Sequence, residues 1–126
     1  MTKRRAIAAA STLFVLLSVF LAFSHAQVAT LNASDSDKVL FGRAITAMHN
    51  SEHVAARTLL ETLINKHPDS DYVPRAKLSI ADAWYSEGNF KEAEMEYVDF
   101  VTFFPNRPEV PKAQLRIDSI HKKAKS

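Results

Sequence analysis

The chain contains no cysteine and only two glycines among its 126 residues. Without cysteine it can form no disulfide, no thiolate zinc site and no cysteine nucleophile. The shortage of glycine argues against a turn-rich β-sandwich, and a hydrophobic fraction of 47% argues against a disordered linker. The length allows one small domain. The composition therefore predicts a single all-α domain stabilised by packing.

Acidic residues are absent before Asp35, whereas Lys3, Arg4 and Arg5 are basic. The formal net charge of +2 therefore comes from the N-terminus, because residues 27–126 carry 13 basic and 14 acidic side chains. A basic patch is the usual mark of a nucleic-acid-binding protein. Its absence from the rest of the chain predicts no nucleic-acid partner.

The first 26 residues have the order of a secretory signal peptide. The three basic residues precede an apolar stretch from Ala6 to Phe23, and Ser24-His25-Ala26 supplies small residues for cleavage before Gln27. The stretch is also nearly long enough to span a bilayer, so an uncleaved N-terminal membrane anchor is the alternative. Under either interpretation the chain after Gln27 is exported. Residues 27–36 then form a short polar tether whose aspartates and serines can cap the next helix.

The chain matches itself when it is shifted by 37 positions. The shift pairs Ala44 with Ala81, Ala56 with Ala93, Leu60 with Tyr97, Leu63 with Phe100, Ile64 with Val101 and Pro68 with Pro105. Repeats of this length are typical of stacked helical hairpins. We therefore predict a domain over residues 37–124, with a first repeat at 37–70, a second at 71–107 and a last helix at 108–124.

Each repeat is predicted to be a helix, a tight turn and a second helix. The first repeat places its helices at 38–49 and 53–67. In the second, Ser70 or Asp71 caps a helix that tolerates Pro74 in its first turn, and Gly88 allows the turn at 86–89. The helix that follows has an apolar stripe, made by Phe90, Ala93, Tyr97, Phe100, Val101 and Phe104. Phe103 lies off that stripe, so it either packs under the last helix or is an exposed contact.

The last helix has an apolar side and a basic C-terminus. Val110, Ala113, Leu115, Ile117 and Ile120 are expected to face the preceding repeat, as in a capping helix that covers the end of a stack. If the chain is instead a truncated longer protein, this apolar edge is a docking surface. Lys122, Lys123 and Lys125 suit the negative end of the helix dipole and could also contact anionic lipid.

These features resemble the tetratricopeptide repeat. The family pattern has alanine, a large apolar residue and proline at set positions, which match Ala93, Tyr97 and Pro105 in the second unit and Ala56, Leu60 and Pro68 in the first. Small residues stand at the eighth position, where Ala44 and Ala81 replace the usual glycine. The small residues have a packing reason, because paired helices approach closely there.

A more specific resemblance is to the BamD family, the outer-membrane lipoproteins of the β-barrel assembly machinery. It is carried by Ala81-Asp82-Ala83-Trp84-Tyr85 and by Glu96-Tyr97-Val98-Asp99-Phe100 leading into Phe103-Phe104-Pro105. The resemblance implies a periplasmic helical solenoid whose early repeats contact unfolded barrel proteins. The resemblance also implies about five repeats and an anchoring cysteine that carries a lipid. This sequence has no cysteine, and Leu21-Ala22-Phe23-Ser24 has serine where the lipidation motif would need cysteine.

The tetratricopeptide resemblance also implies where a ligand binds, because the first helices of such repeats line the concave face. Their second, fifth, ninth and twelfth positions point into it. The predicted peptide-binding residues are Lys38, Phe41, Ile45 and Met48, then Arg75, Leu78, Asp82 and Tyr85, then Lys112, Leu115 and Ser119. Arg75 and Lys112 could grip carboxylates or backbone carbonyls, while Phe41 and Tyr85 offer flat apolar contacts. The alternative is that Ile45, Leu78 and Leu115 belong to the core between repeats.

Catalytic and metal-binding motifs are missing. His49 and His53 have a spacing that can bind zinc on one helix, but a turn at Asn50-Ser51 is predicted between them. Glu92, Glu94 and Glu96 alternate along a helix, so they point away from one another and form its solvated side. We predict no enzyme activity, no cofactor and no metal site.

The function predicted from the sequence is an exported scaffold that binds other polypeptides. It is expected in the periplasm or envelope of a Gram-negative-type bacterium, at the outer membrane in the BamD-like interpretation, where unfolded outer-membrane proteins or assembly components are its partners. The alternative is a periplasmic adaptor of a cell-division or cell-wall system that recognises a folded protein. Membrane association would come from an uncleaved N-terminal helix.

Overall fold

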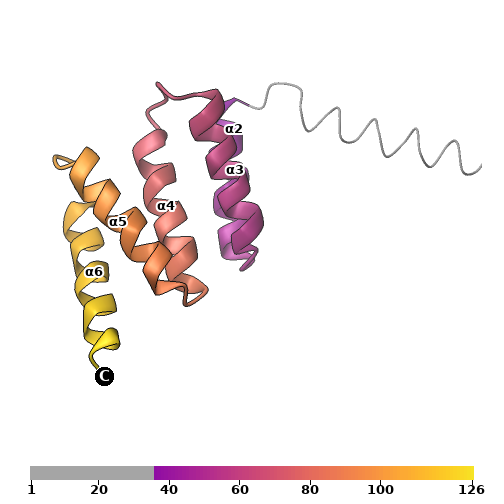
Figure 1. The fold of residues 1–126 in the computed structure, drawn as a ribbon. Coiled ribbons are helices and arrows are strands. Elements are labelled where there is room, and N and C mark those ends of the chain that lie inside the picture. The colour runs from indigo at the N-terminus through magenta and orange to yellow at the C-terminus, as the bar shows by residue number, and fades with distance from the viewer. Residues whose placement is uncertain (1–35) are drawn as a thin grey trace, which may run out of the picture. The chain divides into compact units, whose positions relative to one another are not determined.

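The computed structural model describes residues 36–126, so the proposed signal segment and nearly all of the tether lie outside the described residues. This part is all-helical (Figure 1), which confirms the predicted fold class. The helices are α2 (Asp37–His49), α3 (His53–Lys66), α4 (Val73–Ser86), α5 (Phe90–Phe103) and α6 (Val110–Ala124). Each packs against the next, so the two predicted hairpins, α2–α3 and α4–α5, stack and α6 follows on α5.

The turns inside the two hairpins share one backbone feature, a residue with a positive φ. Gly88, between α4 and α5, has a φ of 80°, and Ser51, between α2 and α3, has a φ of 61°. These residues are equivalent under the 37-residue repeat, so both hairpins reverse through a left-handed residue. Glycine adopts this conformation freely, whereas serine adopts it at a cost. The predicted role of Gly88 is confirmed.

The caps of the first helices in the two hairpins differ. Ser36 caps α2 as expected of the tether, with its hydroxyl oxygen accepting from the Val39 N–H at 3.4 Å. The cap predicted for α4 is wrong, because Tyr72 occupies the cap position and no side chain there bonds the helix. Consecutive turns between His67 and Val73 delay the helix start. Ser70 accepts instead from the Tyr72 N–H and donates to Asp37 at 2.6 Å.

Alanines allow the helices to approach closely. Ala44, Ala56, Ala81 and Ala93 are all 0% exposed, as predicted from the repeat. The core has two apolar clusters, one around Leu60 and Leu63 and one around Tyr97 and Phe100. Trp84 packs against both clusters, so α4 joins the two repeats.

Helix α6 buries one side only. Ala113, Ile117 and Ile120 pack in the second cluster, as predicted, but Leu115 is 69% exposed. The expectation that Leu115 faces the preceding repeat is therefore wrong. Its repeat equivalent, Leu78, is 6% exposed because residues of α5 and α6 pack around it, and among the described residues no helix covers α6 in that way.

Phe103 is also exposed, at 71%, so it does not pack under the last helix. No helix within residues 36–126 has the length and apolar character needed to cross a bilayer.

Candidate polypeptide-binding face

The predicted binding residues lie on α2, α4 and α6, the first helices of successive units. Their exposure divides them into three groups. Lys38, Arg75, Lys112 and Leu115 are exposed; Ile45, Met48, Asp82, Tyr85 and Ser119 are partly buried; Phe41 and Leu78 are buried. We call the exposed and partly buried members the A-helix face. The two buried residues belong to the core, so the flat apolar contact expected from Phe41 is not available.

Arg75 covers Phe41 at the boundary between α2 and α4. The guanidinium carbon lies 4.7 Å from the centroid of the Phe41 ring and 6.0 Å from that of Tyr72. The two rings pack together with their centroids 5.0 Å apart. Arginine over an aromatic ring gains a cation–π contact while its N–H groups still face solvent. Arg75 is thus positioned, and its hydrogen-bond donors remain on the A-helix face.

Asp82 is the polar centre of the face between α4 and α6. It accepts a 2.5 Å hydrogen bond from the Tyr97 hydroxyl of α5 and a 2.9 Å ion pair from the Lys112 ammonium of α6. Because the Tyr97 ring is fully buried, burial and the nearby Asp82 carboxylate raise the pKa of Tyr97 well above its ordinary value. Tyr97 is therefore a permanent donor at neutral pH, and it orients the carboxylate that holds Lys112.

The apolar stripe predicts Tyr97 only as a core residue, although the repeat contains a signal for its role. The first repeat has Ile45 and Leu60 where the second has Asp82 and Tyr97. An apolar pair in one repeat thus becomes a hydrogen-bonded pair in the other. The hydroxyl and the carboxylate occur together in the second repeat, in agreement with the hydrogen bond between them in the structure.

Tyr85 joins α4 to α6 through its hydroxyl, which lies 3.2 Å from the Ser119 hydroxyl. Arg116 and Lys123 of α6 lie over its ring, 4.3 Å and 5.1 Å from the centroid. The Ser119 hydrogen bond and these two cations lower the pKa of Tyr85. Neither cation is among the predicted site residues, because neither stands at one of the four concave positions of the family pattern. Their spacing of four from Lys112 and Ser119 places them on the same side of α6.

The histidines and glutamates considered for a zinc site or for catalysis do not come together in one site. His49 ends α2 and His53 begins α3, on either side of the turn. Glu94 pairs with His121, Glu92 is exposed, and burial raises the pKa of Glu96. In the helical part described, no group of three histidine or acidic side chains could hold a metal ion.

The fold and the shared face define a helical repeat scaffold of the tetratricopeptide type. A family model described as YfiO, outer membrane lipoprotein, matches residues 33–125. The chain belongs to this family, which confirms the resemblance to BamD and supports a place in the cell envelope. A search of curated proteins found no match. Although the family description is of a lipoprotein, this sequence has no cysteine to carry a lipid.

Proposed function

We propose that this chain is an exported scaffold that binds extended polypeptide along the A-helix face and takes part in assembling outer-membrane β-barrel proteins. One observation carries the proposal. Side chains of that face join α4 to α6 through Asp82–Lys112 and Tyr85–Ser119, and Arg75 of the face lies over the buried Phe41 of α2. The face therefore extends across all three helices.

The chemistry of the face suits an extended chain. Lys38 and Arg75 are exposed cations that can donate to backbone carbonyls or carboxylates. Leu115 and the partly buried Ile45 and Met48 provide apolar contacts on the same face. Alternating polar and apolar groups match the alternating side chains of a β-strand segment. Membership of an outer-membrane family supports barrel proteins as the source of such segments.

The test compares two double variants of the full chain in mild detergent. Arg75→Glu/Leu115→Asp changes two exposed residues of the face, and Lys66→Glu/Phe103→Asp makes the same chemical changes at exposed residues elsewhere. Binding to an array of peptides from outer-membrane barrel strands is measured for both and for the unmodified chain. We expect the face variant to bind roughly tenfold more weakly, which corresponds to losing one good contact, and the control to bind normally.

Equal binding by all three proteins contradicts the proposal. So does recovery of a single folded partner from envelope extract that the face variant retains, because that result describes an adaptor working through another surface. Circular dichroism of each variant confirms that loss of binding does not come from unfolding.

A further inference from the structure

One side of α6 collects four cations, and the one acidic residue of the helix, Asp118, lies at the edge of that side and accepts a hydrogen bond from Gln114. Lys112, Leu115, Arg116, Ser119, Lys122 and Lys123 recur at intervals of three and four, so they share one side of the helix. We call this the basic face. The opposite side holds Ala113, Ile117 and Ile120, which are buried against α5. The basic face is therefore not the side buried against α5. It lies next to α4, where Lys112 and Ser119 contact Asp82 and Tyr85, and Lys123 also reaches the Phe90 ring at the start of α5.

Most of this positive charge is not neutralised by a carboxylate of the described residues. Lys112 pairs with Asp82, but no ion pair joins Arg116, Lys122 or Lys123 to a carboxylate within residues 36–126. The neighbouring helix α5 has the opposite character, with four acidic residues and one lysine. The charges are thus separated by helix, and an acidic ligand is attracted to α6 and repelled by α5.

Two of the four cations of the basic face, Arg116 and Lys123, are held in place over aromatic rings. Lys123 lies 4.4 Å from the Phe90 ring centroid, and both Lys123 and Arg116 contact the Tyr85 ring. An open hollow of about 370 Å³ is lined by Lys112, Leu115, Arg116 and Ser119. Hydroxyl and cationic donors therefore line a space beside the exposed Leu115, an arrangement suited to a carboxylate next to an apolar side chain.

We infer that the basic face selects acidic polypeptide segments, with side-chain carboxylates bound by Arg116, Lys122 and Lys123 and one apolar side chain against Leu115. This inference rests on the proposed function and specifies which polypeptides the scaffold prefers. The basic face continues the A-helix face, because Lys112 and Ser119 belong to both and contact Asp82 and Tyr85 of α4.

A membrane surface fits the basic face less well than a polypeptide. Helices that bind at a bilayer interface insert an apolar side beneath their basic residues. The apolar side of α6 is buried on α5, and Leu115 is the one large hydrophobic residue of this helix that is exposed. Hydrogen-bonding groups at Ser119 and Tyr85 are suited to discrete carboxylates rather than to a diffuse layer of lipid headgroups.

The experiment measures fluorescence anisotropy of two peptides with the full chain in neutral detergent. The peptides have the same alternating apolar pattern, and one carries Asp and Glu where the other carries Asn and Gln. We expect roughly tenfold tighter binding of the acidic peptide at low salt, and loss of the difference at high salt. The double variant Lys122→Gln/Lys123→Gln should bind the acidic peptide roughly threefold to tenfold more weakly than the unmodified chain.

The matched control is Lys66→Gln/Lys91→Gln, which removes two exposed lysines from other helices and should bind normally. Equal affinity for both peptides overturns the inference while leaving the proposed function in place. No binding of either peptide overturns the proposed function and the inference with it. Displacement of the acidic peptide by glycerol phosphate, but not by chloride at the same ionic strength, also overturns the inference, because it identifies a phosphate site of the kind that a lipid headgroup occupies.

Discussion

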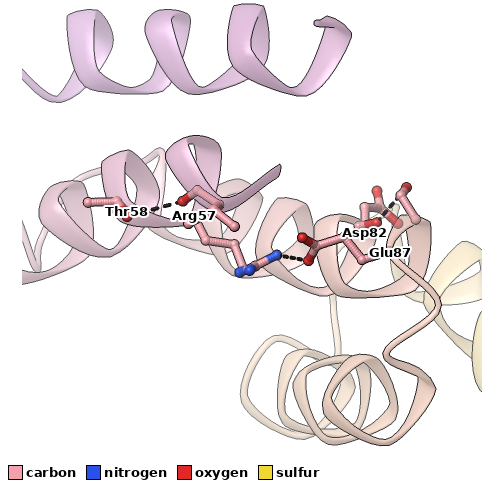
Figure 2. Close-up of polar contacts among 6 residues, drawn as sticks. Arg57, Thr58, Asp82 and Glu87 are labelled. Carbon is pink, nitrogen blue, oxygen red and sulfur yellow. Dashed lines mark hydrogen bonds and ion pairs between the residues drawn. The ribbon is translucent and has the colours of Figure 1, made fainter. Parts of the chain in front are cut away.

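Arg57 of α3 lies over the ring of Trp84 in α4, with the guanidinium carbon 3.5 Å from the ring centroid. The same guanidinium pairs with Glu87 in the turn after α4 (Figure 2). Arg57 is 8% exposed and is the one charged residue that is buried in the described part of the chain. A single side chain of the first repeat is thus held by a ring and a carboxylate of the second.

We expect Arg57→Ala to lower the free energy of unfolding by about 2–4 kcal/mol, because it removes buried packing and leaves Glu87 without its partner. Urea unfolding followed by circular dichroism measures the change. Thr58→Ala, at the exposed neighbouring position, serves as the control and should change stability by no more than about 0.5 kcal/mol. If Arg57→Ala lowers the free energy of unfolding no more than Thr58→Ala does, the Arg57 contacts contribute little to stability.

Tyr97→Phe removes the hydroxyl that donates to Asp82. We expect a loss of about 1–2 kcal/mol at pH 7, because a buried hydrogen bond to a charged acceptor disappears. Thermal unfolding of the two proteins at equal pH measures this loss. A variant as stable as the unmodified chain would contradict the role given to the hydroxyl.

The same pair gives a pH dependence. The pKa of Tyr97 is raised in the fold, so the protonated hydroxyl stabilises the protein fully below the ordinary tyrosine pKa of 10.0. That contribution is lost as pH rises above 10.0 toward the folded-state pKa, at a limiting slope of about 1.4 kcal/mol per pH unit. Stability measured between pH 8 and pH 11 should therefore fall more steeply for the unmodified chain than for Tyr97→Phe. Parallel curves would contradict this assignment.

For Glu96, unlike Tyr97, the protonation state that the fold favours is the one present at acidic pH and not at neutral pH. Burial raises its pKa, with Lys77 opposing and Asp99 and Glu61 reinforcing the shift, so the fold favours the protonated carboxyl. This stabilisation is present below the ordinary pKa of 4.5 and is lost as pH rises through the folded-state pKa. We expect Glu96→Gln to stabilise the protein by about 0.5 kcal/mol at pH 7.

The advantage of Glu96→Gln should vanish when unfolding is measured below pH 4.5. Glu92→Gln, at an exposed position in the first turn of α5, is the control and should give no gain at pH 7. An equal gain from both changes would indicate a general reduction of negative charge on α5 instead of relief of burial.

The two hairpin turns predict changes of opposite sign. Gly88→Ala places a Cβ at a φ of 80° and should destabilise the protein by about 1 kcal/mol. Ser51→Gly removes a Cβ at a φ of 61° and should stabilise it, by about 0.5 kcal/mol. Differential scanning calorimetry of both variants checks the pair, and a shift of the same sign in both would show that the turns are not equivalent.

The sequence by itself determined the helices, their order and the small residues between them. The 37-residue repeat fixed equivalent positions, so Gly88, the buried alanines and the apolar stripe of α5 followed from local spacing and packing. The resemblance to the BamD family also follows from the sequence alone, because it rests on contiguous residues such as Ala81-Asp82-Ala83-Trp84-Tyr85.

Only the tertiary structure decided which polar and apolar side chains became buried. Arg57 follows Ala56 in an ordinary helical pattern, and its burial depends on Trp84 and Glu87, which approach from the other repeat. Leu115 has the same place in its repeat as Leu78 but remains exposed, since cover by a neighbouring helix is not encoded at the position itself. Local spacing sets which way a side chain points along its helix, whereas burial depends on what lies opposite, and that is a property of distant residues brought together by the stack.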